Sequence, residues 1–117
     1  MEIKEYKEFL DTYENKKDYF ECHEILEELW IKETNCETKK HPSVILLQIA
    51  VGAYHWKNKN IIGAKKLFQG VLENYPEVAV EINNIGFDEK KLKKLVEEQL
   101  DKINLGKEFA HFSLPLK

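Results

Sequence analysis

The chain has 117 residues, of which 43% are hydrophobic and 33% are charged, and its formal net charge at pH 7 is −3. This composition excludes a disordered chain, and the length suits one domain over residues 1–117. All 18 basic residues are lysine, so the chain lacks the broad positive field that nucleic-acid binding needs and the bidentate clamp that arginine gives to phosphate. We therefore expect no nucleic-acid partner.

The sequence contains no stretch that resembles a signal peptide or a membrane span. The first residues are charged at alternate positions, and the longest near-apolar run, residues 44–56, is shorter than the ~20 residues that a transmembrane helix requires. Two cysteines, Cys22 and Cys36, are too few for a disulfide scaffold. We expect a cytoplasmic protein with reduced thiols and no membrane partner.

Apolar residues recur at three- and four-residue steps along nearly the whole chain, and this period predicts helices. A first helix is expected to end at the polar run 15–17. A second should begin at Asp18, which stands three residues before Glu21 as in a capping box, and should run to about Lys32. The polar residues 34–42 then predict the longest loop.

The second half of the chain predicts three or four more helices. One opens at Pro42 and is apolar almost all round, which is typical of a helix at the centre of a small domain. The next begins near Ile61, and Pro76 is expected to end it and to open a short additional helix. Asp88 should cap a last amphipathic helix, and residues 106–117 are expected to form an irregular tail. Because no segment alternates with period two, the sequence predicts an all-α fold, a compact single-domain bundle of five to six helices.

Two of these helices carry polar residues on an otherwise apolar face. At about 100° per residue, His23 and Glu27 lie one turn apart at the edge of the buried arc of the second helix. On the third helix, Gln48, Gly52 and His55 fall on one narrow line. A glycine in mid-helix costs roughly 1 kcal/mol relative to alanine, so we expect a neighbouring helix to approach closely at Gly52. If that neighbour is the second helix, the two polar sets face each other across the gap.

Buried polar groups must be satisfied by one another, by water or by a ligand, and this leaves three interpretations. The first is a structural network that fixes the pairing of the helices. The second is a ligand or metal pocket, because two imidazoles and a carboxylate (His23, Glu27 and His55) are the ligand set of a His₂Glu zinc site. The run from His23 to Glu27 departs from the zincin HExxH motif, since glutamate replaces the second histidine. The third is an exposed set with no common role.

The run from Asn15 to Trp30 resembles the signature of a small bacterial and archaeal family known as domain of unknown function 309, in which Phe or Tyr precedes His-Glu-x-x-Glu and then Trp. A second block, residues 47–55, is similar to that family's second conserved stretch. The two matches lie within residues 15–72, although Cys22 stands where alanine is more usual. The resemblance implies a compact helical fold and no assigned reaction. It also implies a polar cluster that comprises His23, Glu24, Glu27, Trp30, Gln48 and His55.

The third and fourth helices are also similar to one tetratricopeptide hairpin, since Gly52, Ala64, Phe68 and Pro76 fall on its motif positions. A single unit cannot form a solenoid. The chain has neither a GxSxG motif nor a P-loop, so nucleophilic and nucleotide-dependent catalysis are disfavoured. We expect a binding or protein-interaction module, with a protein or peptide partner or a homodimer. The alternatives are a metal- or ligand-binding protein that includes a metal-assisted hydrolase, and a purely structural cluster.

Overall fold

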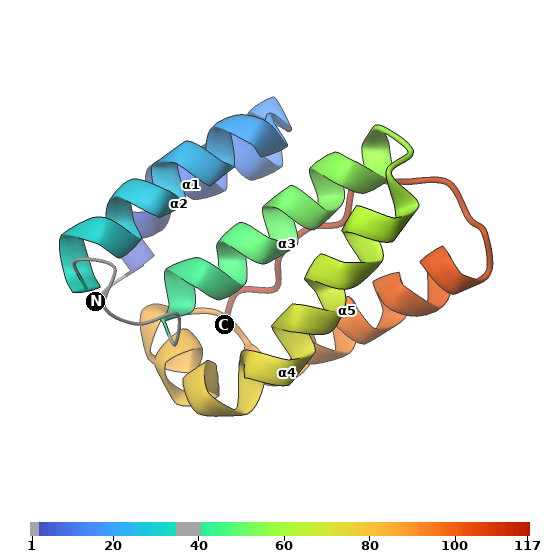
Figure 1. Ribbon diagram of the computed structural model, residues 1–117. Helices are drawn as coiled ribbons and strands as arrows, with labels where there is room; N and C mark the ends of the chain where they lie inside the picture. The colour runs from blue at the N-terminus through green and yellow to red at the C-terminus, as the bar shows by residue number, and fades with distance from the viewer. Residues whose placement is uncertain (1–2, 35–40) are drawn as a thin grey trace.

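The computed structural model describes residues 3–34 and 41–117, and within these ranges the chain forms five α-helices and no strand (Figure 1). The all-α fold is therefore confirmed. Most of the predicted loop over residues 34–42 lies outside the described residues, as does Cys36. The helices are α1 (Lys7–Asp11), α2 (Tyr19–Thr34), α3 (Pro42–Lys57), α4 (Ile61–Ile85) and α5 (Glu89–Asn104).

Helix α1 is the middle part of a longer helical segment. A 3-10 turn (Ile3–Tyr6) precedes α1 and a π-helical turn (Thr12–Lys16) follows it, so the chain stays helical up to the polar run at which the sequence predicts a break. Lys17 ends the segment in the left-handed region, with φ of 52°. The rings of Phe9 and Tyr13 are fully buried and attach this segment to the core.

Side-chain caps fix the starts of two helices at the predicted residues. The carboxylate of Asp18 accepts a hydrogen bond from the backbone N–H of Glu21 at 3.1 Å. The carboxylate of Asp88 accepts a hydrogen bond from the backbone N–H of Lys91 at 3.2 Å. Each bond satisfies one of the N–H groups that a helix leaves without a partner in its first turn.

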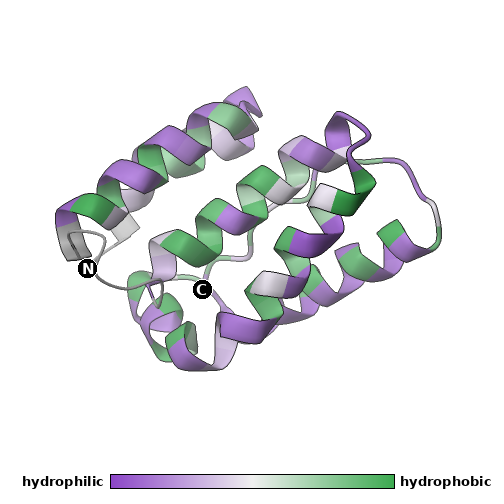
Figure 2. Ribbon diagram, viewed as in Figure 1, coloured by the Kyte–Doolittle hydropathy of each residue, from purple (hydrophilic) through white to green (hydrophobic). Residues whose placement is uncertain are grey.

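Helix α3 is the central helix, because it lies between α2 and α4 and packs against both (Figure 1). Ten of its residues are buried, and hydrophobic residues follow much of its length (Figure 2). This confirms the prediction of a buried helix. Its partly exposed residues share one side of the helix and form what we call the outer stripe: Leu47, Gln48, Val51, Tyr54 and His55.

Helix α4 is longer than the sequence predicts. Pro76 lies inside it, and the chain turns in this half of the helix (Figure 1). Proline has no N–H to donate and its ring crowds the carbonyl of the preceding turn, which bends a helix without necessarily ending it. The predicted break is therefore wrong, and the expected short helix is the continuation of α4 to Ile85.

The segment after α5 contains no helix and crosses back over the core. The hydroxyl of Tyr13 donates a hydrogen bond to the carbonyl of Phe112 at 2.8 Å. The carboxylate of Glu14 accepts one from the N–H of Leu114 at 3.0 Å. Backbone bonds also tie residues 115–117 to residues 86–88. These bonds hold the C-terminal segment in place, so it can supply fixed walls to a pocket.

We expect stability to fall steeply at alkaline pH. Burial raises the pKa of Tyr19 and of the Cys22 thiol, each to about 12, and it raises the pKa of Tyr13 and Tyr75 as well. Because the folded state then holds protons that the unfolded state has lost, this stabilisation is complete below about pH 9 and is lost as the pH rises toward 12. Urea unfolding at intervals from about pH 8 to 12 measures the effect. Ionised tyrosines in a chain that stays fully folded at about pH 12 would contradict it.

Candidate functional site

His23 and Glu27 form a pair on α2 that is open to solvent. The His23 Nε2 atom lies 3.3 Å from the Glu27 Oε2 atom, and the two side chains are 39% and 45% exposed. The buried arrangement predicted from the helical wheel is therefore not found for this pair. In an exposed pair, solvent screens most of the attraction, so little stability depends on it.

Gly52 faces α4 and not α2. A Cβ atom at Gly52 would lie 3.0 Å from the ring of Phe68. Gln48 also lies against α4, since its Nε2 atom would be 3.3 Å from a Cβ atom on Gly70. Its buried Oε1 atom has no hydrogen-bond partner among the residues that the structure describes. The predicted docking against α2 is therefore wrong for Gly52 and Gln48, because a helical wheel gives a direction but not the neighbour that lies in it.

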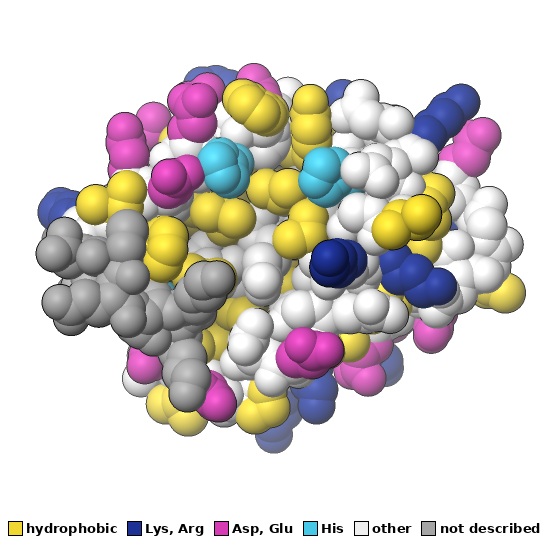
Figure 3. All heavy atoms as spheres, in the orientation of Figure 1, with side chains coloured by type: hydrophobic (Ala, Val, Ile, Leu, Met, Phe, Trp, Pro, Cys, Tyr) yellow, Lys and Arg dark blue, Asp and Glu magenta, His cyan; other side chains and the backbone are white. Residues whose placement is uncertain are grey.

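Two histidines of the predicted cluster nevertheless line the same pocket. His23 from α2 and His55 from α3 line a pocket of about 160 Å³, which we call the histidine pocket, together with Phe20, Val51 and Tyr54. Figure 3 shows two histidine side chains on one face of the molecule with hydrophobic side chains between them. The pocket therefore combines apolar walls with two imidazole edges.

Phe20 is the most exposed wall of the histidine pocket, at 54%. Its ring lies 5.6 Å from that of Tyr54, between ring centroids, and 6.3 Å from that of His23. Phe20 and Tyr54 also line a second pocket of about 320 Å³. The aromatic pair thus separates two adjoining pockets.

The second pocket, which we call the basic pocket, is lined by Lys16, Lys17 and Lys57 and by one acidic residue, Asp18, among others. Lys17 occupies the left-handed region described above. The ammonium group of Lys57 lies 5.8 Å from the centroid of the Tyr19 ring, a cation–π contact. The basic pocket therefore presents positive charge beside exposed aromatic surface.

The remaining predicted residues do not join these pockets. Glu24 is exposed and Trp30 is partly buried on α2, and neither lines the histidine pocket. Val51 and Tyr54, which are three residues apart on α3, line the histidine pocket but were not among the predicted site residues. Their spacing was visible, but apolar residues at such a spacing indicate core packing, which is what most of α3 does.

The described residues offer little to catalysis by a metal or by a thiol. Among them, no group of three or more His, Cys, Asp or Glu side chains is placed to hold a metal ion, so His23, Glu27 and His55 do not gather as the ligand set considered from the sequence. Burial raises the pKa of the Cys22 thiol to about 12, so it stays protonated and unreactive at neutral pH.

These features define a small all-helical protein with two adjoining surface pockets between its second and third helices. A family model described as a domain of unknown function (DUF309) matches residues 6–67, a range that contains the whole histidine pocket. The chain is also 32% identical to the uncharacterized protein YpuF of Bacillus subtilis (strain 168) over 117 residues, which is all of this chain and 67% of that protein. The chain belongs to the DUF309 family.

No solved structure matches the chain. Within the described residues, no helix is both long enough and apolar enough to cross a membrane.

We predict that Gly52→Ala destabilises the protein by about 1–3 kcal/mol, because the new methyl group meets the Phe68 ring inside a packed interface. Gly70→Ala is the matched control. Its methyl group would meet only the flexible end of Gln48, and alanine favours a helix by roughly 1 kcal/mol over glycine. Urea unfolding of both variants measures the difference. Equal destabilisation by the two substitutions would contradict the assignment of Gly52 to the α3–α4 contact.

We predict that His23→Gln and Glu27→Gln each change the free energy of unfolding by less than about 1 kcal/mol, because the pair is exposed. Thermal and urea unfolding at neutral pH measure this. A buried structural pair would give a different result. Either single variant would then lower the free energy of unfolding by about 3 kcal/mol, and the His23→Leu, Glu27→Met double variant would restore it.

Proposed function

We propose that this protein is a protein-interaction module that binds a segment of a partner protein across the α2–α3 face. The observation that carries the proposal is Phe20, a half-exposed aromatic side chain that stands between two pockets. Exposed aromatic side chains beside a pocket are frequent anchors of protein interfaces. The role assumes the cytoplasmic location that the sequence predicts.

The size of the histidine pocket favours a side chain as its occupant. Its volume of about 160 Å³ is close to that of the ~150 Å³ cavity that holds one benzene molecule, and it is below the ~300 Å³ at which most small-molecule sites begin. Its walls suit one aromatic or large aliphatic side chain. The imidazoles of His23 and His55 can form hydrogen bonds with the partner's backbone beside that anchor. One apolar residue of the partner therefore fills this pocket.

The basic pocket determines the charge of the partner segment. Three lysines line it against the single carboxylate of Asp18. Lys17 has a left-handed backbone conformation. This conformation costs a residue with a Cβ atom roughly 1–2 kcal/mol, and glycine or asparagine adopts it more easily. Charge complementarity then calls for acidic residues next to the apolar anchor of the partner.

The other functions considered from the sequence have less support. The metal-binding or hydrolytic alternative lacks a group of three ligands within the described residues. The purely structural alternative is weakened by the exposure of His23 and Glu27. The tetratricopeptide-like character of the α3–α4 hairpin stays a prediction and is compatible with partner binding. A second copy of this chain is the competing occupant of the α2–α3 face.

The test uses two short fluorescent peptides, each with one phenylalanine, flanked by glutamates in the first and by lysines in the second. We expect the acidic peptide to bind the full chain in the micromolar range, more weakly at high salt, and the basic peptide not to bind. Phe20→Ala should weaken binding at least about 10-fold. Lys17→Asn should weaken it about 3–10-fold without loss of stability, because asparagine tolerates the left-handed region. Fluorescence polarisation and urea unfolding measure the two effects.

Lys93→Gln is the matched control, because Lys93 is exposed on α5 and lines none of the pockets described above. It should leave peptide binding unchanged. Equal affinity for both peptides, or unchanged affinity in Phe20→Ala, would refute the proposal. A dimer that dissociates in Phe20→Ala while neither peptide binds would instead assign this face to a second copy of the chain.

A further inference from the structure

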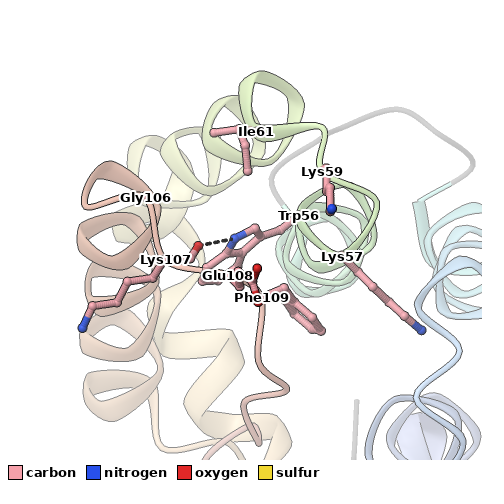
Figure 4. Close-up of a pocket in the computed structure, with 8 residues that line it drawn as sticks. All are labelled: Trp56, Lys57, Lys59, Ile61, Gly106, Lys107, Glu108 and Phe109. Carbon is pink, nitrogen blue, oxygen red and sulfur yellow. Dashed lines mark hydrogen bonds between the residues drawn. The ribbon is translucent and has the colours of Figure 1, made fainter.

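A larger pocket lies at the end of α3, where the chain turns into α4 (Figure 4). Its volume of about 570 Å³ falls within the ~300–1,000 Å³ that is usual for small-molecule sites. Two segments far apart in the sequence line it, the stretch from Trp56 to Ile61 and residues 106–109 of the C-terminal segment. We call it the tryptophan pocket.

The aromatic walls of the tryptophan pocket are held in place by the fold. The indole Nε1–H of Trp56 donates a hydrogen bond to the carbonyl of Lys107 at 3.1 Å (Figure 4). The rings of Trp56 and Phe109 meet edge to face, with 5.5 Å between their centroids. Ile61, 41% exposed, adds an aliphatic wall at the start of α4. The pocket is therefore formed before any ligand arrives.

The charge around this pocket is mainly positive. Lys57, Lys59 and Lys107 line it, against the single carboxylate of Glu108. Figure 4 shows the ammonium groups of Lys57 and Lys107 on opposite sides of the indole. Long, flexible lysine stems allow these point charges to move toward a bound anion.

Lys59 is the second lysine in the left-handed region, with φ of 65°. Among the described residues other than glycine, only Lys17 and Lys59 adopt a positive φ, and each lines a pocket. Because such a conformation is unfavourable for lysine, an observed outlier of this kind is a reason to look for a role of the side chain.

We propose that the tryptophan pocket binds a small organic anion with a planar aromatic body. The aromatic part would pack against the partly buried ring of Phe109 and the side chain of Ile61, beside Trp56, which is itself buried at 3% exposure; aromatic rings favour offset or edge-to-face partners. The anionic group, a carboxylate or a phosphate, would lie among the lysine ammonium groups at the mouth. This site is separate from the histidine pocket and does not depend on the proposed partner protein, although Lys57 lines both it and the basic pocket.

The test follows the indole N–H signal of Trp56 by NMR in the full chain. The chain has two tryptophans, so Trp30→Phe identifies the signal. The probes are 2-naphthoate, 2-naphthyl phosphate and the neutral 2-naphthamide. We expect at least one anion to shift the signal with a dissociation constant below about 1 mM, and the amide to bind at least about 10-fold more weakly. The two anions compared with each other show whether carboxylate or phosphate is preferred.

Two neighbouring substitutions make a matched pair for this test. Ile61→Glu places a negative charge in the pocket wall and should abolish anion binding. Ile62→Glu adds the same charge at a side chain that is 83% exposed and lines none of the pockets described above. It should weaken binding at most about 2-fold. Both substitutions put a carboxylate in the first turn of α4, which favours the helix. Thermal unfolding confirms that each variant folds.

Lys59→Asn should weaken anion binding about 3–10-fold with stability unchanged or higher, and Lys17→Asn should leave it unchanged. These two variants also separate this proposal from the proposed function, since each acts on one pocket only. No shift of the Trp56 signal with either anion would overturn the site. Equal binding of the neutral amide, or equal losses in Ile61→Glu and Ile62→Glu, would overturn its preference for anions.

Discussion

The contact between Gly52 of α3 and the ring of Phe68 of α4 is the constraint on which the rest of the structure depends. The ring occupies the space of the missing side chain, so the two helices approach closely at this point. The same ring meets Trp56 at 6.5 Å and Phe112 at 6.2 Å, between centroids. One aromatic side chain thus joins α3, α4 and the C-terminal segment. Because α3 is fixed against α4 in this way, Val51, Tyr54 and His55 of its outer stripe are left to line the pockets beside α2, whereas Gln48 of the same stripe packs against α4.

The sequence predicts those parts of the fold that are determined locally. Asp18 and Asp88 cap helices because a cap requires only a carboxylate and the N–H groups of the next few residues. The buried nature of α3 was equally visible, as a near-continuous apolar run. Pro76 is different, because whether a helix continues past a proline depends on what its flanks pack against. Val78 and Ile82 are fully buried, and this packing stabilises the continuation of α4.

The candidate site was predicted only in part, because a local sequence pattern does not show which distant segment packs against a residue. His23 and His55 line one pocket as members of the predicted cluster, whereas Gln48 packs toward Gly70 on α4. A helical wheel cannot distinguish these outcomes, since it gives the direction of each side chain but not the helix that lies there. The tryptophan pocket was beyond sequence reasoning altogether. Its two walls are about fifty residues apart in the sequence, and only the return of the C-terminal segment brings them together.

The α2–α3 face and the tryptophan pocket both carry their positive charge on lysine, because the chain has no arginine. Each has aromatic walls next to lysines, and a lysine ammonium is a mobile point charge that sets the sign of a ligand more than its geometry. The surfaces also adjoin, because the ring of Tyr19, which lines the basic pocket, meets that of Phe109, which lines the tryptophan pocket, at 5.5 Å between centroids. An anion in one pocket would lower the positive potential that Lys57 contributes to the other. Two acidic ligands on this end of the molecule would therefore compete for shared charge without sharing a pocket.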